Sequence, residues 1–440
     1  MYFQPEIETM SHDALEALQL ERLKEMAVYC YEKIGFYHRS FDEAGIDPRS
    51  IESLADIEKF PFTVKQDLRD NYPFGMWALD KRDAMRVHAS SGTTGQATVV
   101  GYTRHDLDVW GECFARDIAY TGHDEHAILQ VCYGYGLFTG GLGADGGGLA
   151  MNCLTVPMSS GNTKRQIQVM KDFETDILAC TPSYALNIAD KAIEEGYDPA
   201  SEFAVSSAIL GAEPCSENMR HEIENKLGVK VHDIYGLSEV MGPGVACECA
   251  EQHGLHVAED HFLIEILDPD THQPVPEGEW GEIVLTSLDR EASPLIRYRT
   301  RDISRFLPGA CPCGVTHRRI DRLQGRTDDM LIIRGVNVFP SQIEQVITEF
   351  KEVTPHYQII LSTKGSLDAV ELDIETIPEF DFDEIRQVED LKRRIGAELK
   401  SNLQIKVDLK LVAPHDIVRS EGKAKRVIDN REVKNAWEGK

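Results

Sequence analysis

The stretch with the most decisive pattern covers residues 88–97 and reads HASSGTTGQA. Its two glycines, Gly92 and Gly95, let the backbone bend sharply, so that several N–H groups can converge on phosphate oxygens. The GxxxxGKS or GxxxxGKT pattern of P-loop proteins is absent, so a phosphate loop here is of another kind. Taken alone, the stretch fits a phosphate-binding loop and a polar surface turn equally well, and the neighbouring sequence must decide.

A second motif, DIYGLSE at residues 233–239, lies at the end of a predicted strand at 231–235. A tyrosine at a strand end can stack on a purine ring, and the nearby Glu239 can hold a Mg²⁺ ion that bridges phosphates. In isolation, this motif would fit a packed tyrosine and a solvated glutamate better. Three further motifs follow in the chain: YRTRD at 298–302, GRTDD at 325–329 and RSEGKAKR at 419–426.

The three later motifs also suit a nucleotide reaction. Asp302 follows a predicted strand, and a carboxylate there can accept two hydrogen bonds from a ribose diol. Lys423 stands on a predicted loop, where its ammonium group can neutralise charge that develops on an α-phosphate in the transition state. Each residue alone is more often a surface charge. The order and separation of the five motifs argue against coincidence.

Composition excludes several classes of protein. The chain has 440 residues, 42% of them hydrophobic and 27% charged, which is typical of a globular protein with two or three domains. Its formal net charge of −28 would repel nucleic acids and anionic membranes, so neither is expected as a partner. Residues 1–11 lack the pattern of a signal peptide, and ten cysteines are expected to be reduced thiols or metal ligands in the cytoplasm.

The periodicity changes once along the chain. Ser11 is a predicted N-cap of a helix, and residues 84–290 alternate polar helical stretches with short apolar runs, which predicts a mixed α/β domain. The predicted strands are 127–132, 154–157, 176–180, 207–211, 231–235 and 282–286. After Gly325, strands are predicted at 330–334, 357–362, 369–374 and 406–412, and helices at 341–350 and 382–401. The predicted domains are therefore 1–326 and 327–440.

Together, SSGTTG, YGLSE, YRTRD, GRTDD and EGKAKR resemble the adenylate-forming superfamily of acyl-CoA synthetases, adenylation domains and luciferases. Residues 133–141, 179–184, 236–246 and 328–340 more narrowly resemble the phenylacetate–CoA ligase family, and the resemblance covers almost the whole chain. It implies an α/β fold with a large multi-sheet N-terminal adenylation domain and a small, mobile α+β C-terminal lid, in a homodimer. It also implies the substrates ATP and coenzyme A, with Mg²⁺ as cofactor.

The resemblance assigns roles to individual residues. It implies that Lys423 drives adenylation, that Glu239 binds Mg²⁺ and that Asp328 is the hinge of the lid. The implied ATP site consists of the phosphate loop, two segments beside adenine, Asp302 on the ribose and Arg326 near the nucleotide: Ser90, Ser91, Gly92, Thr93, Thr94, Gly95, Gly211, Ala212, Glu213, Pro214, Asp233, Ile234, Tyr235, Gly236, Asp302 and Arg326. Two positions depart from the superfamily pattern, since Ala97 replaces a proline and Thr98 replaces a lysine that phenylacetate–CoA ligases also lack.

The substrate that the resemblance implies is an aryl-acetic acid, phenylacetate first, with hydroxyphenylacetate or indoleacetate as alternatives. ATP would convert the acid to an acyl-adenylate, from which the CoA thiol displaces AMP. Transfer to a carrier-protein thiol, and a non-catalytic nucleotide sensor, remain alternative functions. The predicted acid pocket, whose aromatics would equally suit an ordinary core, is Tyr133, Tyr135, Phe138, Gly140 and Tyr184.

A zinc site is also predicted. Cys311-Pro312-Cys313-Gly314 forms a tight pair of thiols in a turn, and Cys247, Cys249 and several histidines precede it. Two thiolates completed by a cysteine and a histidine from another loop would suit tetrahedral Zn²⁺ in a closed structural site. The preferred ligands are Cys249, His256, Cys311 and Cys313, with Cys247 and His253 as substitutes, and the alternative is four reduced thiols beside a surface histidine.

Overall fold

The computed structural model describes residues 1–90, 97–327, 331–333, 336–364, 367–403, 407–420 and 424–431, to which all structural statements below refer. Seven residues singled out above lie outside this part of the chain: Ser91, Gly92, Thr93, Thr94, Gly95, Asp328 and Lys423.

A nine-stranded sheet forms the centre of the described N-terminal part, in the order β13-β14-β9-β8-β7-β6-β5-β3-β4. The strands from β4 to β7 are parallel to their neighbours, and β7, β8, β9, β14 and β13 pair antiparallel. Their bounds are β3 Ile128–Val131, β4 Leu154–Pro157, β5 Ile177–Cys180, β6 Ser207–Gly211, β7 Lys230–Leu237, β8 Gly242–Glu248, β9 Leu255–Val257, β13 Phe306–Leu307 and β14 Arg319–Ile320.

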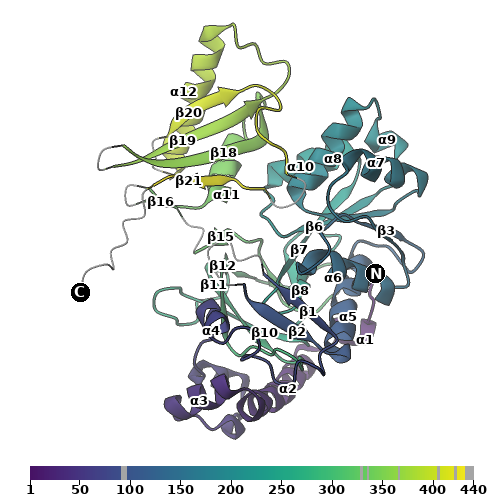
Figure 1. Cartoon of the computed structure of the whole chain (residues 1–440), viewed down its shortest axis with the longest axis vertical. Coiled ribbons are helices and arrows are strands. Elements are labelled where there is room, and N and C mark those ends of the chain that lie inside the picture. The colour runs from purple at the N-terminus through teal and green to yellow at the C-terminus, as the bar shows by residue number, and fades with distance from the viewer. Residues whose placement is uncertain are drawn as a thin grey trace.

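Helices cover both faces of this sheet (Figure 1). Strand β5 illustrates the cause, because Ile177 and Ala179 pack into one core while the alternate residues Leu178 and Cys180 pack into another. The first core contains residues of α5 (Arg104–Tyr120) and α6 (Thr139–Ala150). The second contains residues of three helices, α7 (Thr163–Asp172), α8 (Pro182–Glu194) and α10 (Glu217–Leu227), with α9 (Pro199–Glu202) beside them.

A four-stranded antiparallel sheet lies beside the central one and has the order β10-β11-β12-β15. Its strands are β10 (Phe262–Leu267), β11 (Gly281–Ser287), β12 (Tyr298–Ser304) and β15 (Gly325–Arg326), and β1 (Arg86–Ala89) pairs with β2 (Val99–Tyr102) separately. Residues of four N-terminal helices share its core: α2 His12–Lys33, α3 Gly35–Ala44, η2 Leu54–Lys59 and α4 Lys65–Asp70. Two short helices, α1 Pro5–Glu8 and η1 Pro48–Ser50, precede α2 and η2 in the chain. Ser11 caps α2 as predicted, since its side chain accepts a hydrogen bond from the Ala14 N–H.

The C-terminal part has its own core and its own sheet, β20-β19-β18-β21. Figure 1 shows it in the upper left of the view, next to α10. Its elements are β16 Leu331–Ile333, β17 Val336–Val338, α11 Pro340–Ile347, β18 Val353–Lys364, β19 Leu367–Thr376, α12 Ile385–Leu403, β20 Asp408–Val412 and β21 Val427–Asp429. The expected α/β fold, with a multi-sheet N-terminal domain and an α+β C-terminal domain, is thereby confirmed.

The predicted boundary after Arg326 falls at the end of β15, which pairs with β12 through Asp302 and Arg326. The N–H of the next residue, Thr327, still donates to the Arg301 carbonyl over 2.7 Å. The division into 1–326 and 327–440 agrees with this pairing and stays a prediction. None of the helices in the described ranges combines the length and apolarity that a membrane span requires.

Candidate active site

Two segments of the predicted adenine site lie side by side because β6 and β7 are parallel neighbours. Gly211 pairs with Ile234 in their register, and a Cβ atom on Gly211 would lie 2.5 Å from the Ile234 carbonyl oxygen. Only glycine fits there without displacing backbone. Ala212 follows with a positive φ of 72°, which turns the chain out of the sheet. The structure therefore joins residues 211–214 to 233–236 at one edge of the sheet, where parallel strands end.

Asp302 is held by two partners from different strands. The Tyr235 hydroxyl donates to its Oδ2 over 2.7 Å, and the Arg326 Nη1 donates to its Oδ1 over 2.9 Å. Burial, followed by the charge of Asp302, raises the pKa of Tyr235 well above its ordinary value, so the hydroxyl stays a donor. A carboxylate can accept several hydrogen bonds at its two oxygens, which is the property that the predicted contact with a ribose diol requires.

One carboxylate oxygen of Glu239 contacts both a lysine ammonium group and a threonine hydroxyl. Its Oε1 lies 2.9 Å from Lys65 Nζ and 3.2 Å from Thr98 Oγ1, and only 6% of the residue is exposed. Thr98 in turn lies 2.7 Å from Ser90 Oγ, so the two ends of the phosphate-loop segment meet beside this carboxylate. Lys65 is the first residue of α4 and belongs to none of the five motifs. The sequence held one indication of such a residue. The lysine that the superfamily has after the phosphate loop is missing after Ala97, so another residue must supply that positive charge.

Asp233 stands in a buried ionic cluster with Glu248, Arg220 and Arg322. The Asp233 N–H donates to Glu248 Oε2 over 3.0 Å, and Arg322 Nε donates to Glu248 Oε1 over 3.2 Å. Arg220 also pairs with Glu248 Oε2. Burial and the neighbouring Glu248 raise the pKa of Asp233, while the two arginines oppose that rise. The cluster fixes the strand that carries the second predicted adenine segment.

Glu213, predicted beside adenine, connects two elements. Its Oε1 accepts from the Ser183 N–H over 2.6 Å, in the first turn of α8. Its Oε2 accepts from the Ala424 N–H over 2.8 Å, in the C-terminal domain. Both oxygens of this carboxylate therefore bind backbone N–H groups.

The predicted acid pocket divides into two parts. A methyl group on Gly140 would lie 2.8 Å from the Phe138 ring and 3.2 Å from the Tyr133 ring, so these residues form one aromatic wall. Tyr135 stands beside it, near Gly141, and its hydroxyl lies 3.4 Å from Asp145 Oδ1. Tyr184 differs, because it is fully buried in the core on the other face of the sheet and donates to the Gly161 carbonyl. That position suits a core residue better than a pocket wall.

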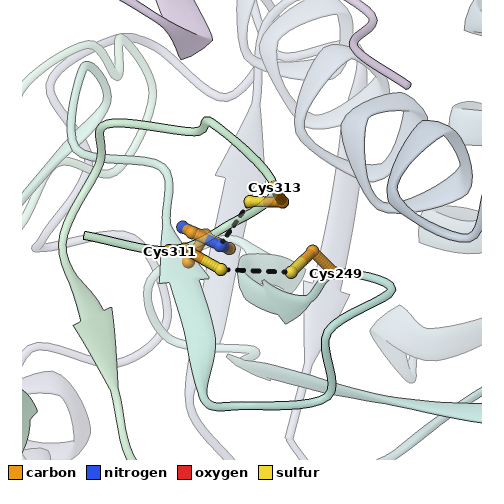
Figure 2. A group of neighbouring side chains, drawn as sticks. Cys249, Cys311 and Cys313 are labelled. Carbon is orange, nitrogen blue, oxygen red and sulfur yellow. Dashed lines mark hydrogen bonds between the residues drawn. The ribbon is translucent and has the colours of Figure 1, made fainter. Parts of the chain in front are cut away.

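The four preferred metal ligands lie together, with all their ligand atoms within 4.8 Å of one another. Cys249 Sγ lies 3.6 Å from Cys311 Sγ, and Cys313 Sγ lies 3.3 Å from His256 Nε2. Figure 2 shows the three thiols converging. The S–S distance is far too long for a disulfide and close to the ~3.8 Å between two thiolates on one tetrahedral Zn²⁺. His256 Nδ1 lies 3.2 Å from the His317 carbonyl, which suits a tautomer with a bare Nε2.

The two substitute ligands lie outside this group. His253 is engaged by Arg319, whose Nη1 lies 2.9 Å from the imidazole Nδ1. Cys247 is fully buried, and its thiol donates to the Glu248 carbonyl. The donor set of three sulfurs and one imidazole fits Zn²⁺. Metal binding itself stays a prediction.

Two family models match the chain: that of the AMP-binding enzyme at residues 41–288 and that of the AMP-binding enzyme C-terminal domain at residues 335–431. The phenylacetate-coenzyme A ligase of Thermus thermophilus is 47% identical over 98% of this chain and 100% of its own. That of Escherichia coli is 46% identical over 98% of both chains. The chain belongs to the phenylacetate–CoA ligase family.

A solved structure of 2-hydroxyisobutyryl-CoA ligase in the postadenylation state, in complex with R3-HIB-AMP, matches with a TM-score of 0.92. It is 28% identical and covers 98% of this chain and 93% of its own. The same protein in the thioesterification state, with CoA, matches over the same shares with a TM-score of 0.72. The domain arrangement of this phenylacetate–CoA ligase family member is therefore closer to the postadenylation structure.

Membership of the phenylacetate–CoA ligase family confirms the expected enzyme class, an AMP-forming ligase that joins an acid to CoA through an acyl-adenylate. Its partners are accordingly the small molecules ATP, acid and CoA. The match extends over both domains, which favours the ligase over the non-catalytic nucleotide sensor.

Proposed function

We propose that the acid is phenylacetate or a close aryl acetate, which the enzyme joins to CoA with release of AMP and pyrophosphate. The observation that carries this proposal is the 46–47% identity with four phenylacetate-coenzyme A ligases, over at least 97% of this chain. The aromatic wall of Tyr133 and Phe138 around Gly140 supports the same class of acid, because apolar walls bury an aryl ring well.

The chemistry needs activation because the oxygen of a carboxylate is a poor leaving group. The carboxylate oxygen attacks the α-phosphorus of ATP, so that an O–P bond forms, the bond to the β-phosphate oxygen breaks, and pyrophosphate leaves. The CoA thiolate then attacks the carbonyl carbon of the acyl-adenylate, and AMP leaves. Both steps depend on positioning and on stabilising phosphate charge, and no enzyme nucleophile takes part.

The residues that the structure brings together suit these tasks. Asp302, oriented by Tyr235 and Arg326, would accept the ribose hydroxyls. Lys65 beside Glu239 supplies a positive charge next to the two ends of the phosphate-loop segment, in place of the missing lysine. Glu239 fits a Mg²⁺ ligand, because it is a buried carboxylate beside the two ends of the phosphate-loop segment. When bound, Mg²⁺ neutralises charge on the phosphates.

We propose a structural role for the Cys/His group. Cys249, His256, Cys311 and Cys313 would hold one zinc ion with four protein ligands, which leaves no open position for chemistry. The ion would tie the loop at 311–314 to the ends of β8 and β9. The homodimer and the cytoplasmic location expected from the sequence stay predictions.

The function is tested by acid-dependent AMP formation with ATP, Mg²⁺ and CoA. The acids are phenylacetate, 4-hydroxyphenylacetate, indoleacetate, benzoate and acetate, and the control is Lys423→Ala. Preference for an aryl acetate, lost in the variant, supports the proposal. A higher kcat/KM for benzoate or acetate contradicts the aryl-acetate assignment. AMP release that does not depend on CoA while a carrier-protein thiol is acylated would favour the carrier alternative.

A further inference from the structure

Glu213 makes a contact that the nucleotide site does not require. One of its carboxylate oxygens accepts the Ser183 N–H at the start of α8, and the other accepts the Ala424 N–H. The first N–H groups of a helix lack intrahelical partners and attract negative charge, so α8 fixes this carboxylate in place. The carboxylate thus presents a rigid acceptor to the C-terminal domain.

Ala424, whose N–H donates to Glu213, lies next to a residue with a predicted role in the reaction. Ala424 immediately follows Lys423, the residue assigned to adenylation. A cavity of about 400 Å³ lies beside the contact. It is lined by Ser183 of the N-terminal domain and by Tyr357, Lys425 and Arg426 of the C-terminal domain. Among the described residues, no buried hydrophobic cluster includes side chains of both domains, and the contacts given between them are polar.

Other described contacts between the domains join side chains, among them His356 Nε2, which lies 3.6 Å from Asp190 Oδ2 at a mostly buried position. Asn218 Nδ2 donates to Thr348 Oγ1 over 3.0 Å, and His415 Nε2 lies 3.3 Å from Glu194 Oε1. The His415 side chain is 59% exposed, and exposed pairs of this kind contribute little. Glu213 differs because it binds the backbone beside Lys423.

We propose that Glu213 is a positioning residue that holds the segment following Lys423 against helix α8 during adenylation and releases it for thioester formation. We call the pair of hydrogen bonds from Ser183 and Ala424 to Glu213 the clip. The similarity to the postadenylation structure supports the first half of this proposal, because the contact belongs to that domain arrangement. The proposal rests on the proposed function through the role of Lys423. It assigns Glu213 to domain arrangement in place of adenine binding.

The test separates the two half-reactions in Glu213→Ala and Glu213→Gln. ATP–pyrophosphate exchange reports adenylation, and release of AMP from isolated phenylacetyl-adenylate with CoA reports thioester formation. Exchange should fall about 10- to 100-fold in Glu213→Ala, as expected for lost hydrogen bonds to a charged acceptor. Glu213→Gln keeps one acceptor oxygen and should lose less. Thioester formation should stay within about twofold of wild type, because the clip is open in that step.

His415→Ala, which removes an exposed contact between the same domains, is the matched control and should leave both half-reactions within about twofold of wild type. Equal losses in both half-reactions for Glu213→Ala would overturn the proposal, since a general defect would explain them. A raised KM for ATP with unchanged kcat would overturn it in favour of adenine binding.

Amide hydrogen exchange tests the clip independently of activity. Exchange in peptides covering residues 424–431 should accelerate about tenfold in Glu213→Ala and less in Glu213→Gln, while peptides from β18 and β19 stay unchanged. Unchanged exchange at 424–431 would overturn the clip even in an active enzyme. If the wild-type protein lacks pyrophosphate exchange while the Glu213 variants still show faster amide exchange at 424–431, the result contradicts the proposed function and retains the clip.

Discussion

Tyr235 and Asp302 are joined by a hydrogen bond of 2.7 Å that links β7 of the nine-stranded sheet to β12 of the four-stranded sheet. Both residues are buried, and they come from motifs separated by 67 positions in the chain. The hydrogen bond orients Asp302, which is predicted to bind ribose, through Tyr235, which is predicted to lie beside adenine. Both sheets therefore contribute residues to the predicted nucleotide site.

Removing this hydroxyl tests that dependence. We expect Tyr235→Phe to raise the KM for ATP about tenfold in pyrophosphate exchange, because Asp302 loses a buried donor and its orientation. Tyr31→Phe is the matched control, since Tyr31 donates to Asp42 over 2.9 Å at an exposed site far from the nucleotide motifs. Equal KM values for the two variants would contradict the assigned role of Tyr235.

Lys65 is expected to stabilise phosphate charge beside Glu239. Lys65→Ala should lower the rate of pyrophosphate exchange about tenfold or more, because a charged partner is lost from a buried carboxylate. Lys59→Ala, which removes an exposed lysine paired with Asp56 over 2.6 Å, should have no measurable effect. If both lysine variants keep the wild-type rate, the ion pair of Lys65 with Glu239 has no part in adenylation.

Gly140 should govern the size of the acid pocket. In Gly140→Ala the added methyl group would press on Phe138 and Tyr133, so kcat/KM for phenylacetate should fall about tenfold relative to that for acetate. Gly146→Ala in the same helix is the matched control, because no atom lies within 4 Å of its added methyl group. A selectivity change of equal size in both variants would point to a general effect of altering α6.

The Cys/His group should hold one zinc ion per chain. Elemental analysis of the purified protein should find it, and Cys313→Ser or His256→Ala should lose it, whereas Cys215→Ser should keep it because Cys215 lies outside the group. Loss of the metal should lower the thermal midpoint without changing kcat per folded molecule, since a closed site does no chemistry. Stoichiometric zinc in Cys313→Ser would exclude this ligand set.

Local patterns in the sequence were sufficient for most of the fold. The predicted strands 154–157 and 207–211 coincide with β4 and β6, and the Ser11 cap is where the sequence places it. Apolar runs end at turn residues, and capping depends on neighbours within one helical turn, so both features can be recognised in a short stretch of sequence. The five motifs are also short stretches of sequence, and together they indicated the family.

The partners of individual site residues depended on tertiary structure. The sequence offered two cysteines and two histidines as alternatives in the metal group, and only the packed chain brings Cys249 and His256 to Cys311 and Cys313. It gave no indication that Lys65 meets Glu239 or that Glu213 reaches Ala424, and it left open whether Tyr184 lies in a pocket or in the core. Local sequence determines elements, because their hydrogen bonds and periodicity are short-range. Contacts across tens or hundreds of residues form only when those elements pack, and packing decided which side chains meet.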